Sequence, residues 1–275
     1  MKKMHNNIEE TSEGVIELPI KKQQLETNKI YYEDCKKGMQ NLPEMSIDHF
    51  YADPPFNINF SKKESMYNRK KKHVIKGYKE PNVSYYEFSK SWIEQCYKIL
   101  KENGSGWICS GWSNLKDVLR AIDDCGFTIV NHVIWKYQFG VYTKKKFITS
   151  HYHLLFVVKN PKQWYFDKNC RWDDVRDKNG NINYRDRQDV WTINRPYNNG
   201  KDKNANTQPP ELVRKAIEYT TKKGDVILDP FMGGATTAVV CILLERNYIG
   251  FEINKNLEGY QNGRIVDAYT EKNTA

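Results

Sequence analysis

The tetrapeptide Asp53-Pro54-Pro55-Phe56 has the residue types needed to hold and activate an aromatic amine. Such an amine is a poor nucleophile, because its lone pair is delocalised into the ring. A carboxylate and a backbone carbonyl that accept its two N–H bonds would return charge to the nitrogen, and an aromatic side chain could stack on the ring. The two prolines would fix the turn so that a carbonyl points at the substrate. The same residues could also form an ordinary turn that ends a strand.

A second motif lies near the C-terminus and has the composition of a ligand-binding turn. Small residues let a backbone approach a ligand closely, and the N–H groups of a following helix would face that ligand. The turn lacks the lysine of a phosphate-binding P-loop, which argues against a nucleoside triphosphate. The motif reads Leu228-Asp229-Pro230-Phe231-Met232-Gly233-Gly234-Ala235-Thr236-Thr237. Glu252 ends the next predicted strand and could accept hydrogen bonds from ribose hydroxyls, although a solvated acid is the simpler interpretation of that residue alone.

Together these motifs resemble those of the DNA amino-methyltransferases, the family that makes N6-methyladenine and N4-methylcytosine. The first is similar to their catalytic motif, and the second to their loop for S-adenosyl-L-methionine (SAM). Their order along the chain is similar to that of the circularly permuted β class. The resemblance implies a Rossmann-like α/β fold, SAM as cofactor and chemistry that needs no metal. It covers about residues 29–265, apart from most of 160–205.

Other segments extend the resemblance. Residues 32–35 resemble the segment that contacts the SAM adenine, and residues 206–210 the segment that flanks its methionine part. Trp135-Lys136 and residues 146–151 resemble segments near the target-base pocket. The cofactor-binding residues implied in this way are Asp34, Cys35, Asp53, Gln208, Asp229, Phe231, Gly233, Gly234, Thr236 and Glu252.

Two positions depart from the family pattern. The family's Gln-Lys-Pro is Gln208-Pro209-Pro210 here, so any contribution of the lysine is missing. The last glycine of the cofactor loop is Ala235, which fits without strain only if that position needs no positive φ.

Basic and aromatic residues indicate a nucleic-acid partner. Residues 61–79 form a strongly basic run directly after the first motif, and its cations could neutralise phosphates, although each lysine alone is more typical of a solvated surface. Residues 160–207 lie where β-class enzymes carry their target-recognition region. The residues predicted to contact double-stranded DNA are Lys62, Lys63, Arg69, Lys70, Lys71, Lys72, Lys136, Lys146, His151, Arg171, Arg185, Arg187 and Arg195.

The elements that must position these motifs alternate between strands and helices, which predicts a mostly parallel sheet. Strands are expected at 29–32, 47–52, 107–109, 128–135, 152–158, 226–228 and 248–251. Helices are expected from Ser84 with Gly104 shortly beyond the end, at 114–124, from Pro209-Pro210, from the glycine turn to Glu245, and at the C-terminus. We expect a flexible tail over 1–27, a catalytic part over 28–159, a recognition insertion over 160–207 and a SAM-binding part over 208–275.

Composition agrees with a nucleic-acid partner but does not require one. The chain of 275 residues has a formal net charge of +9, and its six cysteines form no C-x-x-C pair. The N-terminus has no apolar signal region, and no apolar run is long enough to cross a bilayer. We therefore expect a cytoplasmic protein with reduced thiols. The resemblance leaves open a homodimer and a cognate restriction endonuclease as partners.

The substrate has several candidates. The first position of the tetrapeptide is Asp53, whereas N4-cytosine enzymes of the family more often carry serine there, so N6 of adenine is favoured. N4 of cytosine is the alternative. RNA methylation ranks lower because no RNA-binding module is present. A non-catalytic nucleic-acid-binding subunit of the same fold is the remaining alternative.

Overall fold

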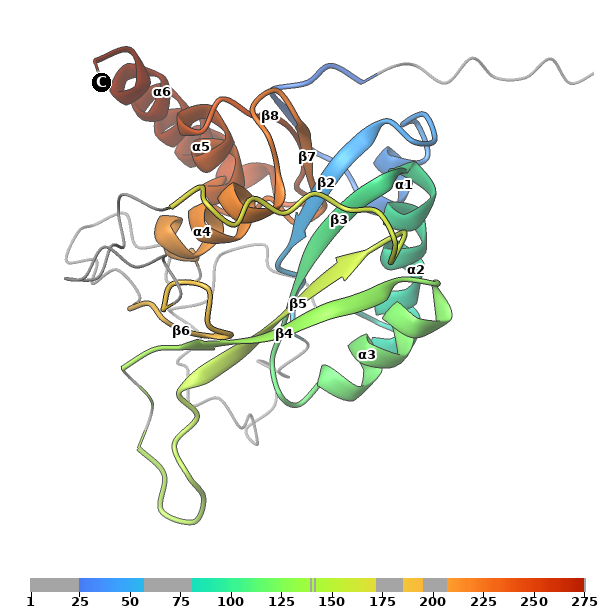
Figure 1. The fold of residues 1–275 in the computed structure, drawn as a ribbon, viewed down its shortest axis with the longest axis vertical. Helices are drawn as coiled ribbons and strands as arrows, with labels where there is room; N and C mark the ends of the chain where they lie inside the picture. The colour runs from blue at the N-terminus through green and yellow to red at the C-terminus, as the bar shows by residue number, and fades with distance from the viewer. Residues whose placement is uncertain are drawn as a thin grey trace, which may run out of the picture.

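The computed structural model describes residues 25–56, 81–138, 140, 142–171, 185–194 and 207–274. Its central feature is an eight-stranded sheet with strand order β1-β8-β7-β2-β3-β5-β4-β6 (Figure 1). β5 runs antiparallel to both of its neighbours, and the remaining strand pairs are parallel. The strands are β1 (Lys29–Tyr31), β2 (Ile47–Ala52), β3 (Leu100–Ser110), β4 (Thr128–Lys136), β5 (His151–Val158), β6 (Val190–Thr192), β7 (Val226–Asp229) and β8 (Asn247–Phe251).

Helices cover both faces of this sheet, which confirms the predicted α/β class. One face packs against α4 (Pro210–Thr220), α5 (Thr236–Leu243) and α6 (Glu258–Thr274). The other packs against α1 (Cys35–Met39), α2 (Tyr85–Ile99) and α3 (Leu115–Asp124). A short 3-10 helix, η2 (Lys255–Leu257), precedes α6. No helix of the described residues is long and apolar enough to span a membrane.

Helix α2 shows how local sequence sets an element. Ser84 caps its N-terminus and accepts a hydrogen bond from the backbone N–H of Glu87 at 3.2 Å, as in a capping box. The apolar residues that follow at three- and four-residue spacing give one buried face, with Trp92 and Ile93 fully buried. The helix ends at Ile99 and passes directly into β3 at Leu100, so Gly104 lies shortly beyond the helix end as predicted, but inside a strand, and does not itself stop the helix.

The remaining differences from the predicted elements are local. α1 was not predicted, because five residues are too short for a periodic pattern. α5 ends at Leu243, before Glu245, whose φ is 60°. Within the predicted insertion, β6 is a strand of the main sheet and pairs with β4 through Trp191 and Trp135. That insertion is therefore joined to the sheet, which the lack of apolar periodicity in its sequence had hidden.

Two of the predicted segments lie mostly or wholly outside the described residues. The tail predicted over 1–27 is described only at 25–27, and the basic run 61–79 lies outside the described residues. Both therefore stay predictions.

Candidate active site

The two predicted motifs meet at one edge of the sheet. The strands β1, β8, β7 and β2 are adjacent and parallel, so their carboxyl ends lie together. Asp53 directly follows β2, Asp229 ends β7, and Glu252 directly follows β8. In open α/β sheets, ligands bind outside the carboxyl ends of the strands. The geometry therefore places three carboxylates around one candidate site.

The tetrapeptide that is predicted to be catalytic lies between a polar side chain and an aromatic ring. Asp53 and Phe56 are half-buried, and Pro54 is buried. The side-chain amide of Asn114 donates a hydrogen bond to the backbone carbonyl of Phe56. The Phe56 ring lies 5.4 Å from that of Tyr152, at an interplanar angle of 34°. Asn114 is the N-cap residue of α3, and Tyr152 lies in β5. No sequence motif predicted that either of them is part of the site.

The aromatic contact continues behind Phe56. The ring centroid of Tyr152 lies 5.6 Å from that of Trp135 and 5.5 Å from that of Tyr137. Trp135 is anchored in turn, because its indole N–H donates a 2.8 Å hydrogen bond to the carbonyl of Ile193 beyond β6. The rings thus form an apolar wall beside the tetrapeptide, which suits a pocket for an aromatic base.

Asp229 shapes the glycine turn through both of its oxygens. Oδ1 accepts a 2.8 Å hydrogen bond from the N–H of Phe231, and Oδ2 accepts one of 2.5 Å from the hydroxyl of Thr237. Burial raises the pKa of Asp229 to about 7, and the charges of Asp53 and Glu252 add to this increase. We therefore assign the Asp229 side chain to holding the turn. The ring of Phe231 packs edge-on against Trp92 of α2, with centroids 5.3 Å apart.

The turn is also held from α6, which the sequence motifs did not predict. The side-chain amide of Gln261 donates a 2.7 Å hydrogen bond to the carbonyl of Gly233, and the hydroxyl of Tyr32 donates one of 2.6 Å to Oε1 of Gln261. Arg264 donates to the carbonyl of Gly234 and to Oγ1 of Thr236. A polar face on the last helix thus fixes the backbone of the turn.

Ala235 occupies the left-handed region, with φ 62° and ψ 29°. Ala235 replaces the last glycine of the family's cofactor loop and would fit without strain only at a position that needs no positive φ. The structure shows that this position has a positive φ, so the alanine is strained. A non-glycine residue in this conformation costs about 1–2 kcal/mol. The backbone N–H of Ala235 still closes the turn on the carbonyl of Met232 at 2.8 Å.

Glu252 is tied to the same turn and remains close to the site. Its Oε2 accepts a 2.8 Å hydrogen bond from the N–H of Gly233, and its Oε1 accepts one of 2.7 Å from that of Asn254. Burial raises its pKa. Each carboxylate oxygen has a second lone pair, so Glu252 can also accept from hydroxyl groups of a ligand.

The other predicted cofactor residues flank this turn. Gln208 accepts a hydrogen bond from the hydroxyl of Tyr51 and lies beside the thiol of Cys109. Asp34 caps α1 and accepts a 2.9 Å hydrogen bond from the N–H of Lys36. Cys35 is buried, and burial raises the pKa of its thiol to about 12, so the thiol stays protonated at neutral pH.

The residues present fit a nucleoside-type cofactor. Within the described residues, Oγ1 of Thr207 is buried and has no hydrogen-bond partner. A Cβ on Gly234 would lie 2.8 Å from this oxygen, so only glycine leaves room there. A narrow turn with an unpaired hydroxyl on one side and the acceptor Glu252 on the other suits a ligand that carries both ribose hydroxyls and a polar tail.

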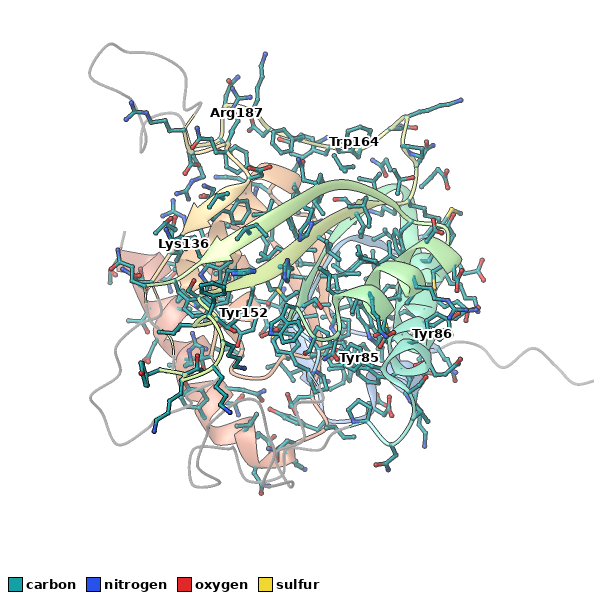
Figure 2. The ribbon with its side chains drawn as sticks, turned by 90° about the horizontal axis from the view of Figure 1, so that it is seen from below. Tyr85, Tyr86, Lys136, Tyr152, Trp164 and Arg187 are labelled. Atoms are coloured by element: carbon teal, nitrogen blue, oxygen red, sulfur yellow. The ribbon has the colours of Figure 1, made fainter. Side chains whose placement is uncertain are left out.

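The predicted DNA-contacting residues have different surroundings. Lys136, Lys146, Arg185 and Arg187 are exposed, and His151 is half-buried beside His153. Figure 2 shows Arg187 on one side of the molecule, and Lys136 with Tyr152 near the ends of β4 and β5. The predicted contacts that lie outside the described residues are Lys62, Lys63, Arg69, Lys70, Lys71, Lys72 and Arg195.

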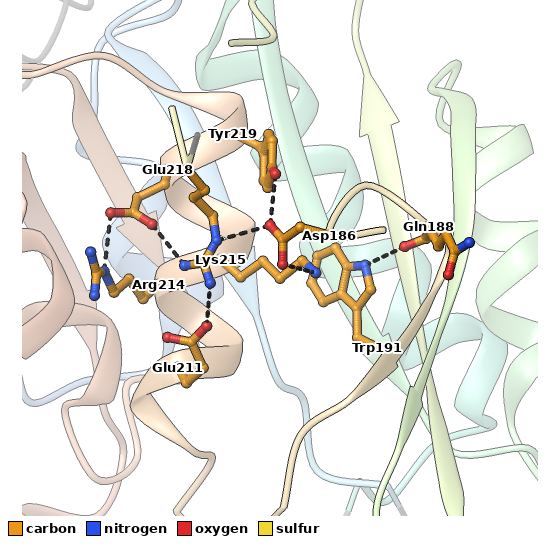
Figure 3. Close-up of polar contacts among 9 residues, drawn as sticks. Asp186, Gln188, Trp191, Glu211, Arg214, Lys215, Glu218 and Tyr219 are labelled. Atoms are coloured by element: carbon orange, nitrogen blue, oxygen red, sulfur yellow. Dashed lines mark hydrogen bonds and ion pairs between the residues drawn. The ribbon is translucent and has the colours of Figure 1, made fainter. Parts of the chain in front are cut away.

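The prediction for Arg171 is corrected, because this residue is only 7% exposed and its guanidinium binds three carboxylates. Figure 3 labels the residues that carry them, Asp186, Glu211 and Glu218. Arg171 binds Asp186 at 3.0 Å, Glu211 at 2.6 Å and Glu218 at 3.0 Å. Burial lowers the pKa of Arg171, but the carboxylates raise it by more, so the guanidinium stays charged. We therefore remove Arg171 from the DNA-contacting set, since its donors are used inside the protein.

The same cluster attaches the predicted insertion to α4. Asp186 accepts hydrogen bonds from Lys215 at 2.9 Å and from the hydroxyl of Tyr219 at 2.7 Å. Lys215 also lies 4.8 Å from the ring centroid of Trp191. Arg171 and Asp186 come from the insertion, and their partners come from the helix that follows Gln208. The ion cluster thus fixes the insertion relative to the candidate active site.

The strand order and the turn after β7 give the chain the Rossmann-like fold of solved DNA methyltransferases. The PvuII DNA methyltransferase (cytosine-N4-specific) has the same fold, with a TM-score of 0.66, 18% identity, and coverage of 88% of this chain and 91% of that one. The TTHA0409 modification methylase of Thermus thermophilus, complexed with S-adenosyl-L-methionine, gives a TM-score of 0.64 and 16% identity over 87% and 93% of the two chains.

Sequence comparisons give the family. The N6/N4 methyltransferase family described as DNA methylase matches residues 47–260. The chain is 30% identical over 234 residues to the Type II methyltransferase M2.MboI of Moraxella bovis, covering 81% of this chain and 82% of that protein. It is 29% identical over 230 residues to M.HpaI of Haemophilus parainfluenzae, covering 80% and 68%. The chain belongs to the N6/N4 family of DNA methylases, whose methyl donor is SAM.

Proposed function

We propose that this protein methylates N6 of adenine within a short, fixed sequence of double-stranded DNA. The observation that carries the proposal is the position of Asp53-Pro54 at the carboxyl end of β2, beside the glycine turn that follows β7. A target amine held by the first would lie next to a methyl donor held by the second. The order of these motifs and the relatives named Type II methyltransferase support methylation of DNA at a fixed sequence, and the choice of adenine is supported by Asp53 alone.

The chain's own residues perform the binding and activation in this proposal. The target base turns out of the duplex, because its amine cannot be reached inside the stack. Phe56 stacks on the base, while the Asp53 carboxylate and the Pro54 carbonyl accept the two N–H bonds. This raises the electron density on the nitrogen, and the lone pair can then form the new N–C bond. SAM, when bound, supplies the electrophilic methyl group and leaves as S-adenosylhomocysteine. The amine then gives up one proton.

Asp53 favours adenine over cytosine, but an N4-cytosine amine could make the same two hydrogen bonds. The cytosine-N4-specific PvuII enzyme has the same fold, so the fold alone does not select the base. N4-cytosine methylation is therefore the second candidate. We also propose that a restriction endonuclease of the same specificity accompanies the protein, as the Type II designation of the relatives suggests.

The experiment that tests the proposal is single-molecule sequencing of plasmid DNA from a methylation-deficient host that expresses the full chain. We expect N6-methyladenine at one short motif, and none with the D53A variant. N4-methylcytosine at a fixed motif would overturn the choice of base. Unmodified DNA, with the protein folded and binding SAM, would contradict the proposed function.

A further inference from the structure

The connection between β4 and β5 exposes large apolar side chains next to a row of lysines. We call residues 137–150 the β4–β5 arm, of which 137, 138, 140 and 142–150 are described. Figure 1 shows this arm extending away from the sheet, at the lower left of the view. The side chain of Phe147 is 98% exposed, that of Tyr142 is 74% exposed, and that of Ile148 is 46% exposed. The exposed lysines of the arm are Lys144, Lys145 and Lys146.

The base of the arm is fixed at the candidate active site. The N–H of Tyr137 donates a 2.9 Å hydrogen bond to the carbonyl of Ser150, which closes the arm at its base. The Tyr137 ring lies against Tyr152, and Tyr152 lies against Phe56 of the catalytic tetrapeptide. The N–H of Gln138 donates to Oδ1 of Asn194, at 3.3 Å. The arm therefore keeps a defined position relative to the pocket for the target base.

The outer part of the arm is held so that Phe147 faces away from the protein. A Cβ on Gly140 would overlap Ile148, so the two sides of the arm approach closely there. The hydroxyl of Thr143 donates to the carbonyl of Lys146 and closes the turn at the end of the arm. One side of Ile148 thus lies against Gly140 while the residue stays 46% exposed, and among the described residues none covers the ring of Phe147 next to it.

The reach of the arm matches the scale of a DNA stack. Phe147 is five residue steps from Tyr152, and five extended steps span at most about 18 Å. Bases follow one another at about 3.4 Å along a strand. Phe147 therefore lies within about five base steps of a base held against Tyr152.

We propose that Phe147 inserts into the DNA stack beside the flipped target base, while Lys144, Lys145 and Lys146 contact the neighbouring phosphates. Turning a base out of the duplex leaves a gap between its neighbours, and apolar side chains are used as wedges at such unstacked steps. An aromatic ring can stack on any base, so this contact assists flipping without reading sequence. The inference rests on the proposed function, because it assumes a flipped base in duplex DNA.

The test uses the full chain and a duplex that contains the methylated motif, with 2-aminopurine in place of the target base. Fluorescence of 2-aminopurine rises when the base leaves the stack. We expect F147A to lose most of this rise and to bind the duplex about tenfold or more weakly, as loss of one base–aromatic stack implies. F147W should retain both. SAM affinity and melting temperature should stay unchanged, because the Phe147 side chain is exposed.

Two matched measurements complete the test. Y269A removes an exposed aromatic ring from α6, which lies at the opposite end of the molecule in Figure 1, and should behave as wild type. Replacing the three arm lysines with alanine should reduce the salt dependence of duplex binding. If F147A flips the base and binds the duplex as well as the wild-type protein does, the proposed insertion of Phe147 is wrong. The proposed function still stands in that case, provided that the wild-type protein methylates the duplex. If the wild-type protein methylates no duplex, the proposed function fails. Equal affinity of wild type and F147A for a duplex of mixed sequence would then reject the DNA contact of Phe147 on its own.

Discussion

The hydroxyl of Tyr51 donates a 2.6 Å hydrogen bond to Oε1 of Gln208, a residue 157 positions away in the chain. Tyr51 lies in β2, two residues before Asp53, and Gln208 immediately precedes the Pro209 cap of α4. The backbone carbonyl of Gln208 in turn accepts from the hydroxyl of Thr236 at 3.5 Å. This contact couples the catalytic strand to both segments that are proposed to hold SAM.

Removing that hydroxyl should therefore weaken SAM binding. We expect Y51F to leave Oε1 of Gln208 without its donor, to lower the free energy of unfolding by about 1–2 kcal/mol and to raise the Kd for SAM several-fold. Urea denaturation and calorimetric titration with SAM measure the two effects. Y86F is the control, because Tyr86 also loses a hydrogen bond, to Asp124, but lies on α2 away from Tyr152 (Figure 2). SAM affinity equal to that of Y86F would contradict the coupling.

Asp53 is expected to act in methyl transfer more than in cofactor binding. In D53A the target amine loses one of its two acceptors, so transfer should fall at least about 100-fold, as for removal of other preorganised polar groups. The Kd for SAM should change little. Single-turnover transfer to a duplex with the recognised motif, together with calorimetry, separates the two quantities. Substantial transfer by D53A would contradict the assignment of Asp53.

The buried carboxyl of Asp229 should give a pH-dependent stability. Its folded-state pKa of about 7 lies above the unfolded value near 3.9, so its contribution to stability is complete below pH 4 and is lost as pH rises to 7. D229N keeps an acceptor for Phe231 and a donor to Thr237, and carries no charge. Relative to wild type, D229N should gain about 2–3 kcal/mol of unfolding free energy between pH 5 and pH 8.

Urea denaturation at the two pH values checks this prediction. D123N, which changes an exposed carboxylate on α3, is the control and should keep the wild-type pH dependence. A difference between D229N and wild type that is the same at both pH values would rule out an elevated pKa for Asp229.

The buried ion cluster around Arg171 should contribute far more to the free energy of unfolding than a surface ion pair does. R171M removes the buried guanidinium that Asp186 and Glu218 share and leaves them only Lys215 and Arg214, which should cost about 3–5 kcal/mol. R171K retains the charge but cannot reach all three carboxylates, so it should fold and show a raised KM for DNA with SAM affinity unchanged. K98A removes the exposed Lys98–Glu94 pair and should cost at most about 0.5 kcal/mol. Wild-type stability in R171M would show that the cluster does not hold the insertion.

Local sequence was enough to predict the elements and motifs that depend on near neighbours in the chain. The strand 47–52 and the helix from Ser84 were predicted closely, because apolar periodicity and a capping residue are local signals. The positions of Asp53 and Asp229 at strand ends were predictable for the same reason. Parallel pairing then brought both residues to one edge of the sheet, as expected for an α/β fold.

Which distant residues meet, and which groups water can reach, depends on how the chain packs in three dimensions. The sequence shows Arg171 as one basic residue among many, and burial beside three carboxylates made it a structural cation. β6 has no periodic pattern and exists because β4 offers an edge to pair with. The contact of Gln261 with the glycine turn likewise depends on how α6 packs. Hydrogen bonds and burial are properties of neighbours in space, and local sequence fixes those neighbours only within a few residues.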